Sequence, residues 1–182
     1  MSLLATQEIS VIMPAYNEEG KIAECVAHAR AHLESLECPY EIIIVDDRST
    51  DGTRAEAIRV SDNPDVRVVG YDRNQGKGSA IKYGTKYVTG DLVVFKDSDA
   101  DVKPDLMKQY VTVLRNNDIA LASKWHHDLR VSIPAMRRLL SHAFNCLVKL
   151  LTGLRVSDTQ SGFKAFRHEA LDSVSSHPKP KS

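Results

Sequence analysis

Three carboxylates stand on alternate residues directly after an apolar stretch of the chain. Asp97, Asp99 and Asp101 follow the segment 92–96, whose apolar composition predicts a buried strand. Carboxylates this close repel one another unless a cation lies among them. Oxygen ligands suit Mg²⁺ or Mn²⁺, which often share them with substrate phosphates. A solvated acidic turn is the alternative, and the position after a buried strand favours the metal.

A glycine–lysine segment follows another expected strand, 66–71, and opens a helix. Its sequence, Asn-Gln-Gly-Lys-Gly over 74–78, suits an anion, because glycine lets backbone N–H groups come close and Lys77 adds a full charge. The P-loop spacing fails because Gly70 lies one residue too far away. The dinucleotide pattern fails because Ile81 replaces its last glycine. Phosphate binding outside these two motifs is predicted, with a plain helix-entry turn as the alternative.

Polar residues also follow the first two expected strands, 9–14 and 41–46. The second strand ends in Asp46-Asp47, and the first leads into Ala-Tyr-Asn-Glu-Glu-Gly over 15–20. Paired acids after a buried strand can accept hydrogen bonds from a base or a ribose. Asp51, a little further on, is expected to cap the next helix. The four strand ends together predict a site for a sugar nucleotide and a metal.

The elements that must position these residues alternate between strand and helix. Such alternation with short connections predicts an α/β fold whose mostly parallel central sheet carries helices on both faces, and ligands of such sheets bind at the carboxyl ends of the strands. The expected strands are 9–14, 41–46, 66–71, 92–96 and 119–123, and the expected helices are 21–36, 53–61, 77–88 and 104–116.

The pattern changes after residue 125. Residues 134–151 have the spacing of a helix that is apolar on one side and carries Arg137, Ser141 and Lys149 on another. This suits a helix lying on a membrane surface, and a helix packed on the sheet is the alternative. A strand is expected over 162–166, followed by a polar tail.

Composition and charge narrow the class of protein. With 182 residues, 42% of them apolar and 26% charged, the chain is expected to form one soluble globular domain. No apolar run approaches the length of a transmembrane helix, residues 1–7 lack the features of a secretory signal, and three separated cysteines suit a reducing, cytoplasmic setting.

The formal net charge of zero hides a division along the chain. Residues 1–123 carry 14 basic and 20 acidic side chains, whereas residues 124–168 carry 8 basic and 2 acidic ones. The later segment is therefore expected to meet an anionic partner. Nucleic acid is not expected, because the basic residues lack interleaved aromatic side chains.

Five motifs, taken in order, resemble the family-2 inverting glycosyltransferases of the GT-A fold, and within them the dolichyl-phosphate mannose and glucose synthases. The resemblance covers roughly residues 8 to 170. The motifs are Pro14-Ala-Tyr-Asn-Glu18, Val45-Asp-Asp-Arg-Ser-Thr-Asp-Gly-Thr53, Asn74-Gln-Gly-Lys-Gly78, Gly90-Asp91 with Asp97-x-Asp99, and Asp158-Thr-Gln-Ser-Gly-Phe-Lys164.

The resemblance implies transfer of glucose or mannose, with inversion, from UDP-glucose or GDP-mannose to a dolichyl or other polyprenyl phosphate. It places the enzyme peripherally, at the cytoplasmic face of a membrane. A family-2 enzyme that acts on a saccharide acceptor is the alternative. By the same resemblance the nucleotide sugar is bound by Pro14, Tyr16, Glu18, Asp46 and Lys77, with Asp47 beside them.

The resemblance also assigns the remaining site residues. Asp97 and Asp99 are the implied catalytic residues: Asp97 holds donor phosphate or metal, and Asp99 and Asp101 complete the ligands of Mg²⁺ or Mn²⁺. The implied contacts to the acceptor phosphate are Lys124, Arg137 and Ser141.

Two halves of a single domain are expected from this assignment. Residues 1–123 form the nucleotide-sugar-binding half, and residues 124–182 form the acceptor side with the basic amphipathic helix. Similar enzymes continue beyond the Gly-Phe-Lys motif with a further segment that often includes transmembrane helices. A truncated chain or a compact member of the family is therefore expected.

Overall fold

The computed structural model describes residues 7–96, 104–114, 116–121 and 164–175. The chain divides into two compact units, one formed by residues 1–120 with 163–182 and the other by residues 121–162. The description below concerns the first unit. The expected helix over 134–151 lies outside the described residues, as do six of the predicted site residues, namely Asp97, Asp99, Asp101, Lys124, Arg137 and Ser141.

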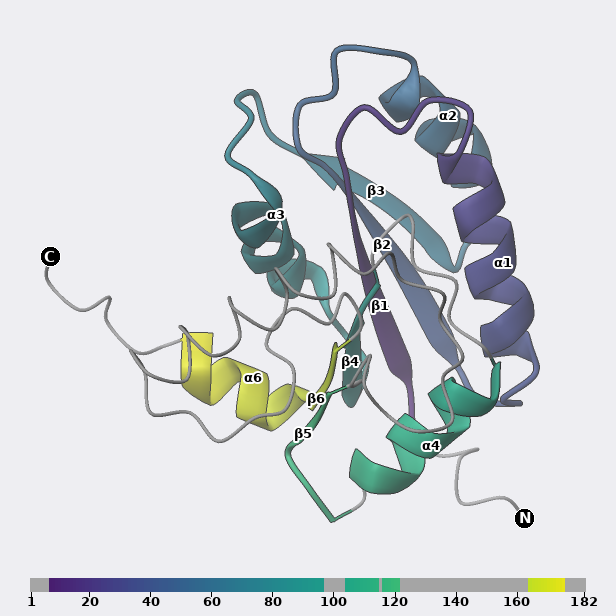
Figure 1. Ribbon diagram of the computed structural model, residues 1–182, viewed down its shortest axis with the longest axis vertical. Helices are drawn as coiled ribbons and strands as arrows, with labels where there is room; N and C mark the ends of the chain where they lie inside the picture. The colour runs from purple at the N-terminus through teal and green to yellow at the C-terminus, as the bar shows by residue number, and fades with distance from the viewer. Residues whose placement is uncertain (1–6, 97–103, 115, 122–163, 176–182) are drawn as a thin grey trace, which may run out of the picture. The chain divides into compact units, whose positions relative to one another are not determined.

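A six-stranded sheet forms the centre of this unit (Figure 1). Its strand order is β3-β2-β1-β4-β6-β5. The pairs β1–β2, β1–β4 and β2–β3 are parallel, whereas β4–β6 is antiparallel. The strands are β1 (Ile9–Ala15), β2 (Tyr40–Asp46), β3 (Val66–Gly70), β4 (Leu92–Phe95), β5 (Ile119–Leu121) and β6 (Lys164–Arg167).

Helices lie on both faces of the sheet (Figure 1). On one face α1 packs beside α2 and α4, and it turns Ile22, Val26, Ala29 and Leu33 inward. On the other face α3 packs against β1, β2 and β3, and α6 packs against β6. The helices are α1 (Ile22–Glu34), α2 (Thr53–Val60), α3 (Lys77–Gly84), α4 (Pro104–Leu114) and α6 (His168–Ser175), and a 3₁₀ turn, η1, covers Thr85–Tyr87.

The central strands are buried on both faces, as their uninterrupted apolar runs require. Ile12, Ile43 and Val45 are fully buried and face α3. A Cβ atom at Gly84 would lie 2.8 Å from a methyl carbon of Ile12 and 3.0 Å from one of Val45. Glycine at this position therefore lets α3 pack directly on the sheet.

A buried glutamate connects β1 and β2 at the edge of the sheet where these strands begin. Glu41, which is 8% exposed, accepts hydrogen bonds from the Ser10 hydroxyl at 2.6 Å and from the Thr89 backbone N–H at 2.7 Å. The Ser10 oxygen in turn accepts the N–H of Gly90 at 2.9 Å. This network holds the starts of β1 and β2 to the connection that enters β4.

The structure confirms the predicted α/β class and the mostly parallel sheet. It also confirms the order along the chain of the first five strands and four helices. The helix expected over 77–88 ends at Gly84 and continues as the 3₁₀ turn, since glycine and the β-branched Thr85 both weaken an α-helix. The last strand lies at Lys164–Arg167, slightly later than expected. No helix was predicted at α6, where a polar tail was expected.

Candidate functional site

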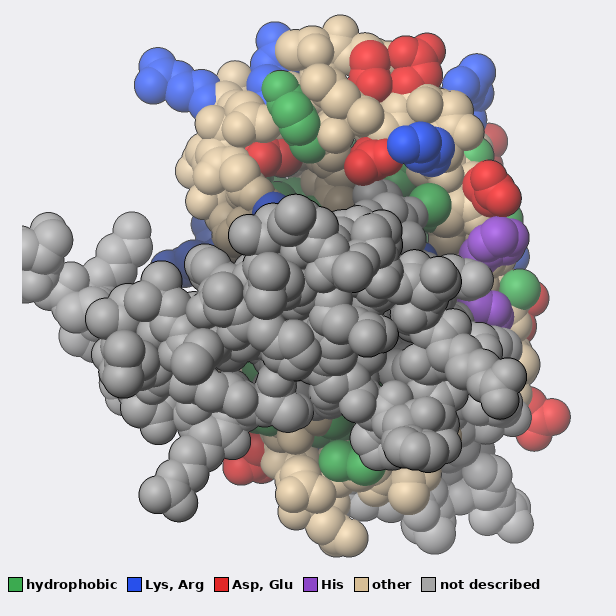
Figure 2. All heavy atoms as spheres, in the orientation of Figure 1, with side chains coloured by type: hydrophobic (Ala, Val, Ile, Leu, Met, Phe, Trp, Pro, Cys, Tyr) green, Lys and Arg blue, Asp and Glu red, His purple; other side chains and the backbone are tan. Residues whose placement is uncertain are grey.

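The loops after β1, β2 and β3 meet at the carboxyl edge of the sheet. The parallel register places Ala15 beside Asp46, and Asp46 beside Gly70. The backbone N–H of Asp47 donates to the carbonyl oxygen of Ala15 at 2.9 Å. Acidic and basic side chains lie close together over the upper part of the described surface in Figure 2, where these loops run. The edge predicted to carry the site is therefore assembled by β1, β2 and β3.

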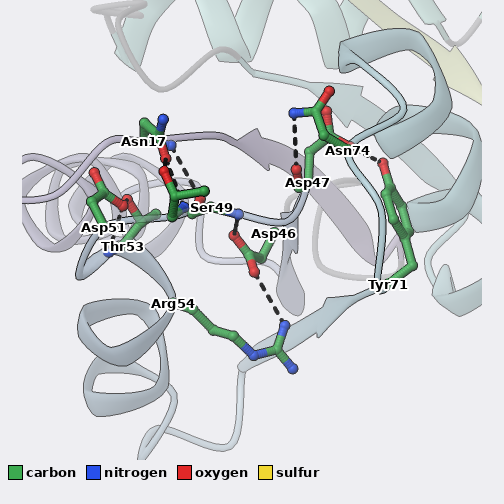
Figure 3. A network of polar contacts seen from close by, with 10 residues as sticks. Asn17, Asp46, Asp47, Ser49, Asp51, Thr53, Arg54, Tyr71 and Asn74 are labelled. Atoms are coloured by element: carbon green, nitrogen blue, oxygen red, sulfur yellow. Dashed lines mark hydrogen bonds and ion pairs between the residues drawn. The ribbon is translucent and has the colours of Figure 1, made fainter.

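The loops after β1 and β2 are bound to each other through side chains. The backbone N–H of Asn17 donates to the Ser49 hydroxyl at 3.1 Å, and the Asn17 side-chain oxygen accepts the Thr50 N–H at 2.9 Å (Figure 3). Asn17 has a φ of 54°, in the left-handed region that asparagine tolerates better than most residues. The Glu18 N–H donates to the Thr53 hydroxyl at 2.7 Å. Two segments more than thirty residues apart thus form one platform.

Each of the two helices that follow this platform is capped from outside its own sequence. Glu56, on α2, accepts the N–H of Ala23, in the first turn of α1, at 3.1 Å, and the N–H of Gly20, two residues before that helix, at 2.7 Å. Glu19 accepts the N–H of Gly52, at the start of α2, at 2.9 Å. These contacts satisfy backbone donors that a helix leaves without partners at its N-terminus.

Asp51 was predicted to be the N-cap of the next helix, but the N-cap of α2 is Gly52, one residue later, and Asp51 instead bonds to Thr53, the first residue of the helix. The Asp51 carboxylate accepts the Thr53 N–H at 3.0 Å and the Thr53 hydroxyl (Figure 3). The hydrogen bond from that hydroxyl is the main cause that holds the pKa of Asp51 below its ordinary value. Glu18, one of the predicted nucleotide residues, is therefore joined to α2 through Thr53.

Tyr16 projects from this platform, and 47% of it is exposed. Pro14 lies in the last part of β1, and Glu18 lies in the loop that follows, within 3.8 Å of the ammonium group of Lys21. An exposed aromatic ring on a loop fixed by several hydrogen bonds is suited to stack on a planar ligand.

Asp46 is almost completely buried at the end of β2. Its carboxylate accepts the Ser49 N–H at 3.0 Å and forms an ion pair with Arg54 at 3.3 Å (Figure 3). A Cβ atom at Gly70 would lie 2.6 Å from the Arg54 guanidinium and 2.8 Å from the Asp46 carbonyl oxygen. Glycine at the end of β3 therefore leaves room for this ion pair.

Asp47, which is 3% exposed, faces the loop after β3. Its carboxylate accepts the Tyr71 hydroxyl at 2.7 Å and the N–H groups of Gln75 and Gly76, each at 2.8 Å. The Asn74 amide donates to the Asp47 carbonyl oxygen at 3.1 Å (Figure 3). Asp47 is thus the centre of the turn that leads to Lys77.

Lys77 is the first residue of α3. The residue before it, Gly76, has a φ of 83°, which favours glycine, and its carbonyl accepts the N–H groups of Ser79 at 3.0 Å and Ala80 at 3.1 Å. The N-cap residue of this helix is Gly76, which has no side chain to cap it. A helix N-terminus with a lysine beside it favours an anion.

The acidic segment begins where β4 ends. Lys96, directly after β4, is buried, and its N–H donates to the carbonyl oxygen of Ile12 at 3.0 Å. β4 and Lys96 thus end at the same edge of the sheet at which Asp46 and Asp47 lie. Within the described ranges, His, Cys, Asp and Glu side chains form no cluster of three that could hold a metal ion.

A shallow hollow of about 570 Å³ opens on the outer side of the loop after β2. Arg48, Arg54 and Ile58 help to line it, and none of the described nucleotide residues predicted above does. The structure describes six of the predicted nucleotide residues, and all six lie at the ends of β1 and β2 or in the segments that follow β1, β2 and β3: Pro14, Tyr16, Glu18, Asp46, Asp47 and Lys77.

Two residues with a direct part in this arrangement, Tyr71 and Arg54, were not predicted. Tyr71 stands one residue after the end of β3, the kind of position that carries the other site residues, so its place along the chain was an available signal. Arg54 lies on α2 and reaches back to Asp46, and no spacing rule indicates such a contact.

The mostly parallel sheet with helices on both faces defines a Rossmann-like α/β protein of the GT-A class. The model of the family described as "Glycosyl transferase family 2" matches residues 10–175. The chain belongs to this family, which confirms the resemblance seen in its motifs.

Curated relatives refine the comparison. The chain is 35% identical over 176 residues to a dolichyl-phosphate beta-glucosyltransferase of Drosophila melanogaster, covering 87% of this chain and 54% of the relative. It is 33% identical to the human protein of the same name, covering 91% and 56%. It is 31% identical to a dolichol-phosphate mannosyltransferase of Pyrococcus furiosus, covering 94% and 49%. The chain thus spans about half the length of the curated relatives it matches.

Solved structures agree on the fold. A mannosyltransferase from Pyrobaculum calidifontis, in complex with GDP-mannose and Mn²⁺, matches with a TM-score of 0.68 and 23% identity, over 94% of this chain and 48% of that one. Glucosyl-3-phosphoglycerate synthase from Mycobacterium tuberculosis, in complex with Mn²⁺, UDP-glucose and phosphoglyceric acid, matches with a TM-score of 0.67 and 25% identity, over 90% and 58%. Among the described residues no helix has both the length and the apolarity needed to cross a bilayer.

Proposed function

We propose that this chain transfers a hexose from a nucleotide sugar to a polyprenyl phosphate, with inversion at the anomeric carbon. The observation that carries the proposal is the family-2 match over residues 10–175 together with relatives named as dolichyl-phosphate glucosyl- and mannosyltransferases. UDP-glucose and GDP-mannose are the two donors that these names and the two solved complexes suggest.

On the donor side, Pro14, Tyr16, Glu18, Asp46 and Lys77 bind the nucleotide, with Asp47 beside them. Tyr16 is exposed on a loop that hydrogen bonds hold to the loop after β2, which supports stacking of the nucleotide base on its ring. The start of α3 at Lys77 supports binding of the diphosphate nearby.

Asp97, Asp99 and Asp101 hold Mg²⁺ or Mn²⁺ in this proposal. Three carboxylates of this spacing are the hard oxygen ligands that both ions prefer, and the chain enters them at the edge that carries Asp46 and Asp47. A divalent ion bound there would neutralise charge on the leaving nucleoside diphosphate.

On the acceptor side, Lys124, Arg137 and Ser141 bind the phosphate of the lipid. A phosphate is already anionic at neutral pH, so its attack on the sugar needs little help from a general base. What the protein supplies is in-line positioning of two phosphate groups and compensation of their charge. A lipid acceptor requires the enzyme to work at a membrane surface, and the resemblance to the dolichyl-phosphate synthases supports peripheral binding at the cytoplasmic face.

Transfer of a radiolabelled sugar tests the proposal. The protein is incubated with labelled UDP-glucose or GDP-mannose, Mn²⁺ and polyprenyl phosphate, and the lipid is then extracted. Label in the lipid phase, lost in excess EDTA, is the expected result. Label transferred only to an added saccharide would favour the alternative acceptor class, and label that stays on both nucleotides would contradict the proposal.

A further inference from the structure

Tyr71 lies between two parts of the site that come from different strands. Its hydroxyl donates to Asp47, after β2, at 2.7 Å. Its ring meets the ring of Tyr83, on α3, edge to face, with centroids 5.1 Å apart and planes at 82°. The side chain therefore connects the end of β2 to the helix that starts with Lys77.

Asp47 holds the same turn through its other contacts. One carboxylate oxygen accepts both the Tyr71 hydroxyl and the Gln75 N–H, and the other accepts the Gly76 N–H. Three donors on one carboxylate fill most of its acceptor capacity. Asp47 thus acts mainly on the protein's own turn.

The turn held in this way sets the direction in which α3 begins. Gly76 donates its N–H to Asp47 at 2.8 Å, and its carbonyl accepts from Ser79 at 3.0 Å and Ala80 at 3.1 Å in the first turn of the helix. With a φ of 83°, Gly76 turns the chain sharply between these two sets of bonds. A change at Asp47 or Tyr71 therefore moves the start of the helix, where Lys77 stands.

We propose that Tyr71 is a positioning residue, which through Asp47 holds the 74–77 turn in the conformation that presents Lys77 and the start of α3 to the donor's diphosphate. The identity of the ligand rests on the proposed function. The hydrogen bond between Tyr71 and Asp47 rests on the geometry of the described residues. In this role Tyr71 acts through Asp47, to which its hydroxyl donates.

Tyr71→Phe tests the hydrogen bond to Asp47, because it keeps the ring and its contact with Tyr83 and removes only the hydroxyl donor. Tyr87→Phe is the matched control: it removes a hydroxyl that donates to the Tyr83 hydroxyl at 3.0 Å, further along the same row of aromatic rings. Both variants lose one phenol oxygen from the same aromatic cluster, so a general loss of stability affects both.

Two readouts are compared: amide hydrogen exchange at Gln75 and Gly76 in the free protein, and the dissociation constants of UDP and GDP with Mn²⁺. We expect Tyr71→Phe to speed exchange at both amides at least about threefold. We also expect the variant to raise the dissociation constant of whichever nucleotide, UDP or GDP, the wild type binds. The expected rise is about tenfold, because the hydrogen bond lost from Tyr71 to Asp47 is charge-assisted. When the donor concentration is varied, kcat should change much less than the KM for the donor. Tyr87→Phe should match the wild type in every measurement.

Unchanged exchange in Tyr71→Phe, or faster exchange with an unchanged nucleotide constant, would overturn the inference and leave the proposed function standing. An equal loss of nucleotide affinity in Tyr87→Phe would also overturn it, since the effect would then belong to the aromatic cluster. If the wild-type protein binds neither nucleotide, the proposed function itself fails, and the inference fails with it.

Discussion

Glu56 caps a helix to which it does not belong: from α2 its carboxylate accepts the N–H of Gly20 at 2.7 Å, at the entrance to α1. Glu19, beside Gly20, accepts in return from the start of α2. The two helices therefore depend on each other for their first turns, and the loop that carries Tyr16 and Glu18 is fixed as a consequence.

Replacing Glu56 with alanine should destabilise the fold. The change leaves two backbone donors without their acceptor, one in the first turn of α1 and one just before that helix. Loss of a capping residue costs about 1 kcal/mol, within a range of about 0.5–2. Urea denaturation measures the difference. Glu34→Ala is the control, because the contacts of Glu34 are exposed: an ion pair with Arg30 at 3.2 Å and a hydrogen bond from the Tyr40 hydroxyl at 3.2 Å. Exposed ion pairs contribute about 0–1 kcal/mol. Equal losses in the two variants would contradict the capping role.

Asp99→Asn should lower turnover about 10²-fold or more, in line with loss of charge stabilisation in the transition state. Initial rates at several Mg²⁺ and Mn²⁺ concentrations measure the effect. The exposed Asp62→Asn serves as the control and should keep wild-type rates. Full activity of Asp99→Asn, or wild-type activity in excess EDTA, would refute the metal assignment.

Lys77→Ala should weaken binding of the nucleoside diphosphate about ten- to a hundredfold. The expected loss follows from a charge-assisted hydrogen bond worth about 1.5–3 kcal/mol. Isothermal titration calorimetry gives the dissociation constant directly. Lys82→Ala, an exposed lysine on the same helix, should leave it unchanged. If the two lysine variants bind equally well, Lys77 is a surface charge and nothing more.

Arg137→Ala should raise the apparent KM for polyprenyl phosphate about tenfold or more, because a cation able to bind phosphate through two hydrogen bonds is lost. The dissociation constant of the nucleotide should stay nearly the same. Arg138→Ala should instead weaken binding to liposomes with less effect on KM. Weaker nucleotide binding in both variants, with the acceptor unaffected, would place this segment outside the acceptor site.

The contribution of Tyr71 to stability should depend on pH only in alkaline solution. Burial, with the Asp47 and Asp46 carboxylates nearby, raises the pKa of Tyr71 above its ordinary value of about 10. The unfolded chain therefore ionises first, so the stabilisation is fully present below pH about 10 and declines as pH rises beyond it. The difference in unfolding free energy between the wild type and Tyr71→Phe should be constant from pH 7 to 9. A change within that interval would contradict the assignment.

The order of the elements and the edge that bears the site were predictable from the sequence. Apolar runs such as Ile42–Val45 indicate buried strands, because a strand covered on both faces has no polar side to present. Parallel strands then bring their carboxyl ends together, so Asp46, Asp47 and Lys77 were expected at one edge without knowledge of any contact. Periodicity and composition are local properties of the chain, and they suffice for this level of description.

Only the tertiary structure decided which partners these residues take. β6 lies antiparallel beside β4, between β4 and β5, and nothing in the sequence near Lys164 indicates that place. Likewise Glu56 caps α1, and Asp47 accepts the Tyr71 hydroxyl instead of pointing to solvent. Each of these contacts joins segments more than twenty residues apart, and their pairing depends on how helices pack on the two faces of the sheet. A local pattern carries no information about that packing, since many distant polar residues could satisfy the same donor.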